Sequence, residues 1–219
     1  MKSFTRPVYP DFDRPLLASL VPINAEKILD IGCNQGKFGF SLKASRPNVE
    51  VWGVEPDGPS SLIAKERLDH VIVDKFHDNN PLPNDYFDLI TFNDSLEHMT
   101  DPAHALSICQ KKIKKGGKIL CCVPNVRHIE NLEHLIFDRD WRYEIEGVRD
   151  RTHLRFFTEK SIIRLFTETG FKVDQVMGVS EDWWDKRKLI RRFFFRFFPK
   201  FTQDMKYVQL VVIASVESK

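Results

Sequence analysis

Short apolar runs of strand type alternate with helix-type segments along most of this chain. Such alternation is typical of a mostly parallel sheet with helices on both faces. The runs of strand type are residues 27–31, 50–54, 70–73, 87–92, 118–123, 171–179 and 207–216. We therefore predict an α/β, doubly wound and mostly parallel sheet of seven strands. The last strand is expected to be antiparallel, because a long segment separates it from the sixth.

Capping residues indicate where the intervening helices begin and end. Asp101 followed by Pro102 is a typical helix start, and Gly116-Gly117 is expected to close that helix. Thr158 is expected to cap a later helix. Two earlier helices are predicted at about 36–44 and 60–68.

The length of the chain favours one domain. With 219 residues, 42% of them hydrophobic and 29% charged, it can bury one sizeable core but has little room for two enzymatic domains. We expect a single domain over 1–219. Its parts are a core at about 20–124, a polar and aromatic insertion over the active face at about 125–157, and a C-terminal part at about 158–219.

The charge and the cysteine content indicate which partners and which cellular environment to expect. Lys and Arg number 33 against 31 Asp and Glu, and this small excess does not favour nucleic acid as a partner. The four cysteines include no C-x-x-C pair, and adjacent Cys121 and Cys122 should point to opposite faces of a strand. The first residues lack a signal-type apolar run, and the stretch 208–216 is too short to span a bilayer. We expect a reducing, cytoplasmic setting.

A glycine-bearing turn, Asp30-Ile31-Gly32-Cys33-Asn34-Gln35-Gly36, follows the first strand. In a doubly wound sheet this turn borders the ligand crevice. A dinucleotide site requires G-x-G-x-x-G, but Asn34 and Lys37 occupy two of the glycine positions. S-adenosylmethionine carries a ribose diol, an adenine and an amino acid but no phosphate. The turn therefore favours S-adenosylmethionine over a dinucleotide.

Acidic residues follow three successive strands. Glu55 is placed to accept hydrogen bonds from a ribose diol, Asp74 from an adenine amino group, and Asp94 from the ammonium of the methionyl part. Asp30 can orient the turn or receive that ammonium. The alternative interpretation is that these acids are solvated loop residues. If the ligand interpretation holds, Glu55 and Gly32 must face the same edge of the sheet.

Residues 27–123 resemble a class I S-adenosylmethionine-dependent methyltransferase of Rossmann-like fold. Ile28 to Gly36 resembles the first motif of that family, although Asn34 stands where many members carry glycine; Asn tolerates a left-handed backbone. The stretch 150–158 resembles bacterial members associated with polysaccharide and quinone-type O-methylation. The predicted cofactor-binding residues are Asp30, Gly32, Cys33, Asn34, Gly36, Glu55, Asp74, Asn93 and Asp94.

The loop after the fourth strand, Asn93-Asp94-Ser95-Leu96, lacks the Pro-Pro of enzymes that methylate adenine amino groups. Adenine N-methylation is therefore disfavoured. An alcohol nucleophile needs a base or a metal to remove its proton.

The candidate base is a histidine. We place His153 first, with His98 and His128 behind it and Asp94 as a further catalytic candidate. His153 could instead be a structural hydrogen-bond donor, and His98 could shape the cofactor pocket. Acids and histidines do not cluster at ligand spacing along the sequence, so we predict no metal.

Residues 183–201 form a segment rich in aromatic and basic side chains. A helix from about 186 to 198 would place Phe193 and Phe197 on one face and Arg192 and Arg196 on the other. This helix could contact an anionic membrane surface, pack on the sheet, or form a homodimer. The sequence leaves these three alternatives open.

Together these features predict an S-adenosylmethionine-dependent O-methyltransferase. Its expected acceptor is a small molecule, a saccharide or a lipid-linked compound at the cytoplasmic face of the membrane. The alternatives are a cofactor-binding protein without catalysis, a quinone-type methyltransferase and an RNA methyltransferase. An RNA enzyme should carry a broad basic surface, whereas the cations here concentrate in 183–201.

Overall fold

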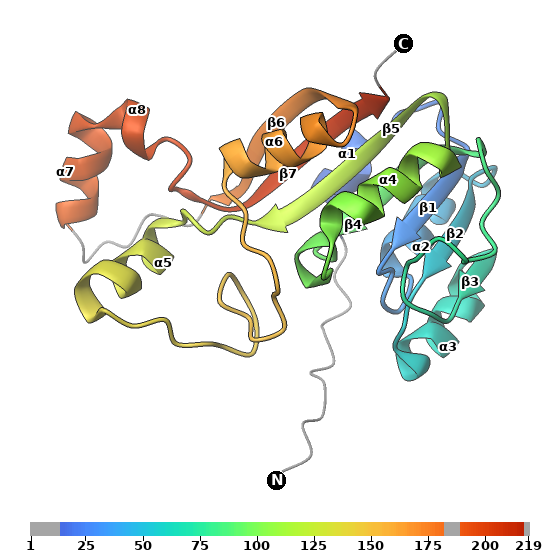
Figure 1. Ribbon diagram of the computed structural model, residues 1–219, viewed down its shortest axis with the longest axis horizontal. Coiled ribbons are helices and arrows are strands. Elements are labelled where there is room, and N and C mark those ends of the chain that lie inside the picture. Colours follow the sequence, from blue (N-terminus) through green and yellow to red (C-terminus); the bar gives the residue numbers. More distant parts are fainter. Residues whose placement is uncertain (1–13, 182–188, 217–219) are drawn as a thin grey trace, which may run out of the picture.

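The computed structural model describes residues 14–181 and 189–216 as one seven-stranded sheet with helices on both faces (Figure 1). The strand order is β3-β2-β1-β4-β5-β7-β6. All neighbours are parallel except that β7 runs antiparallel to β5 and β6, which confirms the predicted fold class. The strands are β1 (Lys27–Ile31), β2 (Glu50–Val54), β3 (His70–Ile72), β4 (Phe87–Asn93), β5 (Ile113–Pro124), β6 (Phe171–Glu181) and β7 (Tyr207–Val216).

Two separate hydrophobic clusters, one for each face of the sheet, hold the helices. Alternation along β5 decides which side chain joins which cluster: Cys121 packs in the first and Cys122 in the second, as predicted. The second cluster includes residues of α1, α2 and α3, and the first includes residues of α4 and α6. These helices are α1 (Pro15–Leu20), α2 (Lys37–Ser45), α3 (Gly58–Arg67), α4 (Pro102–Lys112) and α6 (Glu159–Glu168).

The predicted helix caps at Asp101 and Thr158 are confirmed. The Asp101 side chain accepts a hydrogen bond from the backbone N–H of His104, and Thr158 forms a capping box with Ser161. The expected end at Gly116-Gly117 is wrong, because α4 already ends at Lys112 and β5 begins at the next residue. A Cβ at Gly117 would lie 3.0 Å from backbone oxygens, so this glycine allows close strand approach.

Where the strand order reverses, β1 lies between β2 and β4. The connections after β1 and β2 leave the sheet in the same direction, as parallel pairing requires. The carboxyl ends of β1, β2 and β4 therefore meet at one edge, and a crevice forms there. This crevice positions the candidate site.

A second group of short helices lies at the opposite end of the long axis from β2 and β3 (Figure 1). It consists of α5 (Ile129–Glu133), the π-helix η2 (His134–Asp138), α7 (Leu189–Phe197) and α8 (Pro199–Thr202). The predicted helix of 186–198 is thus observed as α7, and residues 183–188 lie outside the described residues. Across the described ranges, every helix is too short or too polar to traverse a bilayer.

Candidate active site

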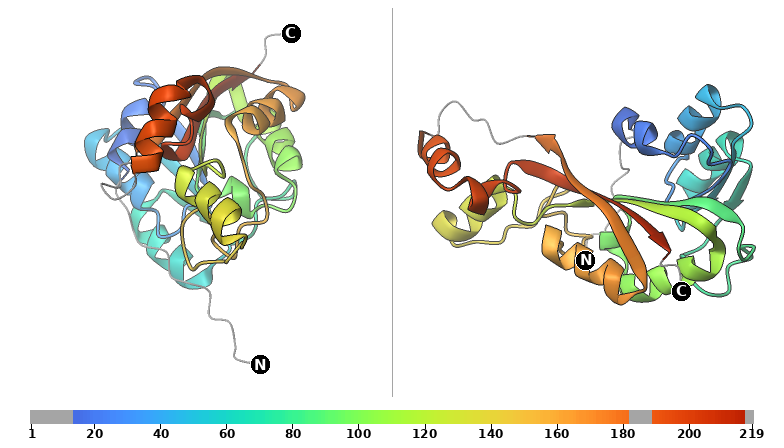
Figure 2. Two further views of the ribbon diagram at one scale, coloured as in Figure 1. Left: turned by 90° about the vertical axis from the view of Figure 1, so that its left-hand side faces the viewer. Right: turned by 90° about the horizontal axis from the view of Figure 1, so that it is seen from above.

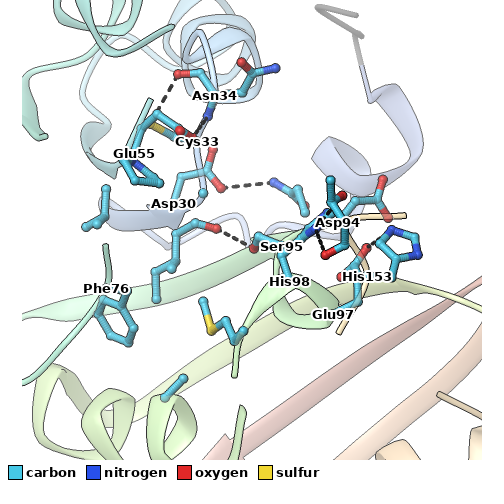
Figure 3. A pocket seen from close by; sticks show the side chains of 18 of the residues that line it. Asp30, Cys33, Asn34, Glu55, Phe76, Asp94, Ser95, Glu97, His98 and His153 are labelled. Carbon is cyan, nitrogen blue, oxygen red and sulfur yellow. Dashed lines mark hydrogen bonds and ion pairs between the residues drawn. The ribbon is translucent and has the colours of Figure 1, made fainter. Parts of the chain in front are cut away.

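A cavity of about 1020 Å³ opens at the carboxyl ends of β1, β2 and β4. The turn after β1 and the loop after β4 line one side. Residues of the 125–157 insertion, among them Val148, Asp150 and His153, line another. Figure 3 shows two groups of polar side chains in this cavity, one around Glu55 and one around Glu97.

The first group fixes the glycine turn against β2. Glu55 accepts hydrogen bonds from the backbone N–H groups of Asn34, at 2.9 Å, and Asp57, at 2.8 Å. Gly32 has φ +75°, and a Cβ there would lie 2.5 Å from Cβ of Ser95, so no other residue fits. Asn34 adopts φ +50°, as its left-handed tolerance predicted. Glu55 and Gly32 face the same cavity, as the ligand interpretation requires.

Two other predicted residues of this turn differ in their placement. Cys33 lines the cavity and is buried, and burial raises the pKa of its thiol well above the usual value. Gly36 does not line the cavity and begins α2 instead. A Cβ on Gly36 would lie 3.2 Å from Cα of Ala64, so this glycine allows the close packing of α2 against α3.

The buried Asp30 and the half-buried Asn93 form a polar pair beside the turn. The Asp30 carboxylate accepts hydrogen bonds from Oγ1 of Thr91, at 2.6 Å, and Nδ2 of Asn93, at 3.2 Å. Burial outweighs these bonds and raises the pKa of Asp30 to about 6. Oδ1 of Asn93 is buried and receives no hydrogen bond. This orphan acceptor beside a carboxylate is suited to a cationic group.

The carboxylate of Asp94 has two side-chain partners in the structure. It pairs with Arg14 and accepts a 2.6 Å hydrogen bond from Nε2 of Gln209. Asp94 lines the cavity, as a cofactor-binding residue must, and it also holds Arg14 at the cavity wall. Arg14, at the start of α1, was not predicted from the sequence.

The prediction for Asp74 is corrected. The residue is exposed and does not line the cavity. Its carboxylate interacts with Nε2 of His77 at 2.9 Å and accepts a hydrogen bond from the backbone N–H of Lys75 at 2.7 Å. Because β3 ends at Ile72, the chain turns before Asp74 reaches the edge, and Phe76 reaches the cavity instead.

The second polar group brings together Glu97, His98 and His153. Nε2 of His153 lies 3.8 Å from Oε1 of Glu97, and the two imidazole rings are 4.8 Å apart (Figure 3). His98 is held by Thr152, whose carbonyl and hydroxyl lie 3.2 and 3.1 Å from its Nδ1. Each of the three offers an atom within 4.8 Å of the others, so a metal could bind here.

The state of this group follows from burial. Nδ1 of His153 lies 3.2 Å from the carbonyl oxygen of Val148, which can only accept, so Nδ1 is the donor in this contact and Nε2 is directed at Glu97. Neither carboxylate oxygen of Glu97 receives a hydrogen bond. Burial, followed by the nearby Asp94, raises the pKa of Glu97 well above its usual range.

Neither Glu97 as a candidate functional residue nor its cluster with His98 and His153 was predicted from the sequence. The available signal was Glu97-His98 directly after the fourth-strand loop, but His153 joins them only through the insertion. His128, by contrast, does not line the cavity. It is buried at the start of α5, where its backbone N–H bonds to the carbonyl of Asn125, and this corrects its place among the candidate bases.

The sheet order, the glycine turn and the buried Glu55 define a class I S-adenosylmethionine-dependent methyltransferase. The family model of a methyltransferase domain matches residues 9–176, so the chain belongs to this family of enzymes. The methyl donor of this class is S-adenosylmethionine.

Known proteins agree with this assignment. The chain is 28% identical over 161 residues to an uncharacterized methyltransferase of Anoxybacillus flavithermus. The aligned region covers 72% of this chain and 75% of that protein. The chain is 26% identical over 173 residues to a ubiquinone biosynthesis O-methyltransferase of Cereibacter sphaeroides, covering 76% and 68%. A solved methyltransferase from Archaeoglobus fulgidus shares the fold, with a TM-score of 0.64, 19% identity and 91% coverage of both chains.

The raised pKa of Asp30 predicts a pH-dependent affinity for the cofactor product S-adenosylhomocysteine. Below pH 6 the carboxyl is protonated and cannot attract an ammonium group. A pKa of about 6 implies that the ionised fraction falls about tenfold from pH 7 to pH 5, and the affinity should fall with it. Calorimetric titrations across this range measure the effect. An Asp30→Asn variant with the same pH slope as the wild type would contradict the assignment.

Proposed function

We propose that the protein transfers a methyl group from S-adenosylmethionine to a hydroxyl oxygen of an acceptor held between Glu55 and His153. The observation that carries the proposal is the position of His153, buried beside Glu97 in the cavity that Glu55 also lines. Its Nδ1 is directed at the carbonyl of Val148, so in the neutral ring Nε2 carries the lone pair that a base needs. The acceptor we favour is a saccharide or the polar part of a lipid-linked molecule. A cavity of about 1020 Å³ is large enough for a donor and part of an acceptor.

The first polar group, around Glu55, has the chemistry to bind the methyl donor S-adenosylmethionine. Glu55 lines the cavity with its carboxylate held by the backbone N–H groups of Asn34 and Asp57. Each oxygen of an ionised carboxylate can accept more than one hydrogen bond, so this group suits a ribose diol. Asp30 and the orphan Oδ1 of Asn93 suit the ammonium group. Arg14 suits the carboxylate of the methionyl part, because it is a cation on the cavity wall that Asp94 already orients.

The second polar group fits proton removal. S-adenosylmethionine supplies a methyl group on a positively charged sulfur, which an oxygen nucleophile displaces to leave S-adenosylhomocysteine. A cation in the cavity lowers the pKa of Glu97 and favours its ionised form, with release of its proton to solvent. Nε2 of His153 then takes the acceptor's hydroxyl proton, and the imidazolium lies 3.8 Å from the carboxylate that stabilises it.

A quinone-type acceptor is the second candidate. One similar protein is a ubiquinone biosynthesis O-methyltransferase and another, from Thermotoga maritima, a demethylmenaquinone methyltransferase. Phenol and saccharide hydroxyls both need a base, so His153 serves either acceptor. A protein that binds the donor but transfers no methyl group, and an RNA methyltransferase, are the outcomes that the experiment below must exclude.

The test has two stages. Calorimetric titration of the purified protein with S-adenosylhomocysteine is expected to show saturable binding, with none for NAD. Labelled S-adenosylmethionine is then incubated with the protein and with lipid, saccharide and RNA fractions of a cell extract. We expect label in the lipid or saccharide fraction. Binding without transfer would contradict catalysis, and label in RNA would contradict the acceptor class.

Chelation of divalent metals is expected to leave methyl transfer unchanged, because Nε2 of His153 can remove the proton without a Lewis acid. The rate with the labelled fraction is measured before and after dialysis against EDTA. Loss of activity that returns with Mg²⁺, Mn²⁺ or Zn²⁺ would contradict proton removal by His153. It would indicate instead that Glu97, His98 and His153 bind a metal.

A further inference from the structure

An exposed aromatic and basic surface lies at one end of the molecule, outside the cavity. It is formed by η2 together with α7 and α8. Helices α7 and α8 are neighbours at one end of the molecule (Figure 1 and Figure 2), and the ion pair of Arg191 with Glu133 joins α7 to the end of α5, directly before η2. Its apolar side chains are between 47% and 67% exposed. They are Leu135, Ile136, Phe137, Phe193, Phe197, Phe198 and Phe201. We call this set the aromatic surface.

The helices beneath the aromatic surface are held firmly. Arg191 of α7 is buried and donates from its Nε to Oε1 of Glu133 at 2.7 Å, in a two-pronged ion pair. Arg127 bridges the carboxylate of Asp204, at 2.6 Å, and the carbonyl oxygen of Phe201, at 2.9 Å. Because Arg191 fixes the buried side of α7, Phe193 and Phe197 on the opposite side are exposed.

The orientation of α7 excludes packing of its exposed aromatics on the sheet. The rings of Phe193 and Phe197 are tilted by 41° with centroids 4.5 Å apart, yet more than half of each residue is exposed. A fold that only needed core material would bury these rings. A group of exposed aromatic side chains at one place is typical of an interaction surface.

The positive charge of α7 and α8 favours an anionic partner. Residues 189–203 contain Arg191, Arg192, Arg196 and Lys200 and no Asp or Glu. Arg192, Arg196 and Lys200 are exposed next to the phenylalanines. A second copy that placed its own α7 and α8 against these helices would bring like charges together, which is unfavourable. Phenylalanine at the acyl boundary with Arg and Lys near lipid phosphates is the arrangement of an interfacial helix.

We infer that α7, α8 and η2 dock the protein on a bilayer that contains anionic phospholipid. The 125–157 insertion connects this surface to the cavity, because it carries both η2 and His153. A lipid-linked acceptor would thus be met at the membrane. That link rests on the proposed function, whereas the docking itself does not require methyl transfer.

Sedimentation of the full chain with vesicles tests the inference. We expect binding to vesicles of phosphatidylcholine mixed with phosphatidylglycerol, and weak binding to phosphatidylcholine alone. Phe193→Ser/Phe197→Ser and Arg196→Gln/Lys200→Gln should each weaken binding roughly tenfold or more. High salt should weaken the wild type further.

Matched controls remove similar groups elsewhere. Ile23→Ser/Leu62→Ser deletes two exposed apolar side chains, and Lys65→Gln/Arg164→Gln deletes two exposed cations, at other faces. Both should bind vesicles as the wild type does. If the Phe193→Ser/Phe197→Ser variant does not fold, Ile136→Ser/Phe137→Ser on η2 tests the same surface.

The inference is overturned if the wild type ignores anionic vesicles, or if the surface variants bind like the controls. It is also overturned if light scattering finds a dimer that the phenylalanine variant dissociates while vesicle binding stays unchanged. S-adenosylhomocysteine titration of the same preparations separates the two claims. Intact cofactor binding without vesicle binding removes only the docking surface, and the reverse result removes only the proposed enzyme function.

Discussion

The His153→Asn variant is expected to lose roughly 10²- to 10⁴-fold in kcat while it still binds S-adenosylhomocysteine as the wild type does. The asparagine amide can replace Nδ1 as donor to the carbonyl of Val148, so the insertion keeps its anchor. It offers no equivalent of Nε2, and the acceptor proton then has no base. Turnover with the labelled acceptor fraction and calorimetry measure the two effects.

A structural function of His153 predicts a different outcome. In that case His153→Asn would retain turnover, whereas a His153→Ala variant would unfold at lower temperature because the buried carbonyl of Val148 loses its partner. The neighbouring His98→Asn variant is the matched control, since it removes an imidazole 4.8 Å away. Equal losses of kcat in both variants would contradict a single base.

Replacement of Glu55 by alanine is the second large effect. Loss of its hydrogen bonds to the ribose should cost about 1 to 3 kcal/mol, a decrease of roughly 5- to 150-fold in affinity for S-adenosylhomocysteine. The change also releases the backbone N–H groups of Asn34 and Asp57 from their acceptor. The glycine turn is therefore expected to loosen as well.

Two further variants serve as controls for Glu55→Ala. Glu66→Ala removes an exposed acid of α3 that does not line the cavity, and its affinity should match that of the wild type. Glu55→Gln keeps one acceptor oxygen and should lie between the wild type and Glu55→Ala. An unchanged dissociation constant in Glu55→Ala would refute the ribose assignment.

The sheet and the Glu55 turn could be predicted because they follow from local pattern. Parallel strands end at one edge, so residues that follow β1 and β2 meet there whatever their separation in sequence. The same argument failed at Asp74, because β3 is three residues long and ends before that residue. It also could not foresee that Asp94 is paired with Arg14 from α1, since that contact is long-range.

The proposed catalytic group and the orientation of α7 depend on tertiary contacts. Helical periodicity separates Phe193 and Phe197 from the arginines, but it does not say which side faces inward; the ion pair between Arg191 and Glu133 decides that. Likewise, Glu97 meets His153 only because the insertion folds back over β4, with Leu154 donating its backbone N–H to the carbonyl of Glu97.

A crystal structure of the protein with S-adenosylhomocysteine tests the assignment of the cavity most directly. We predict the ribose hydroxyls at hydrogen-bonding distance from Glu55, the amino group beside Asn93 and Asp30, and the sulfur facing the side on which Glu97 and His153 lie. A nucleoside bound away from Glu55, or with its sulfur turned from His153, would contradict the proposed site and its chemistry.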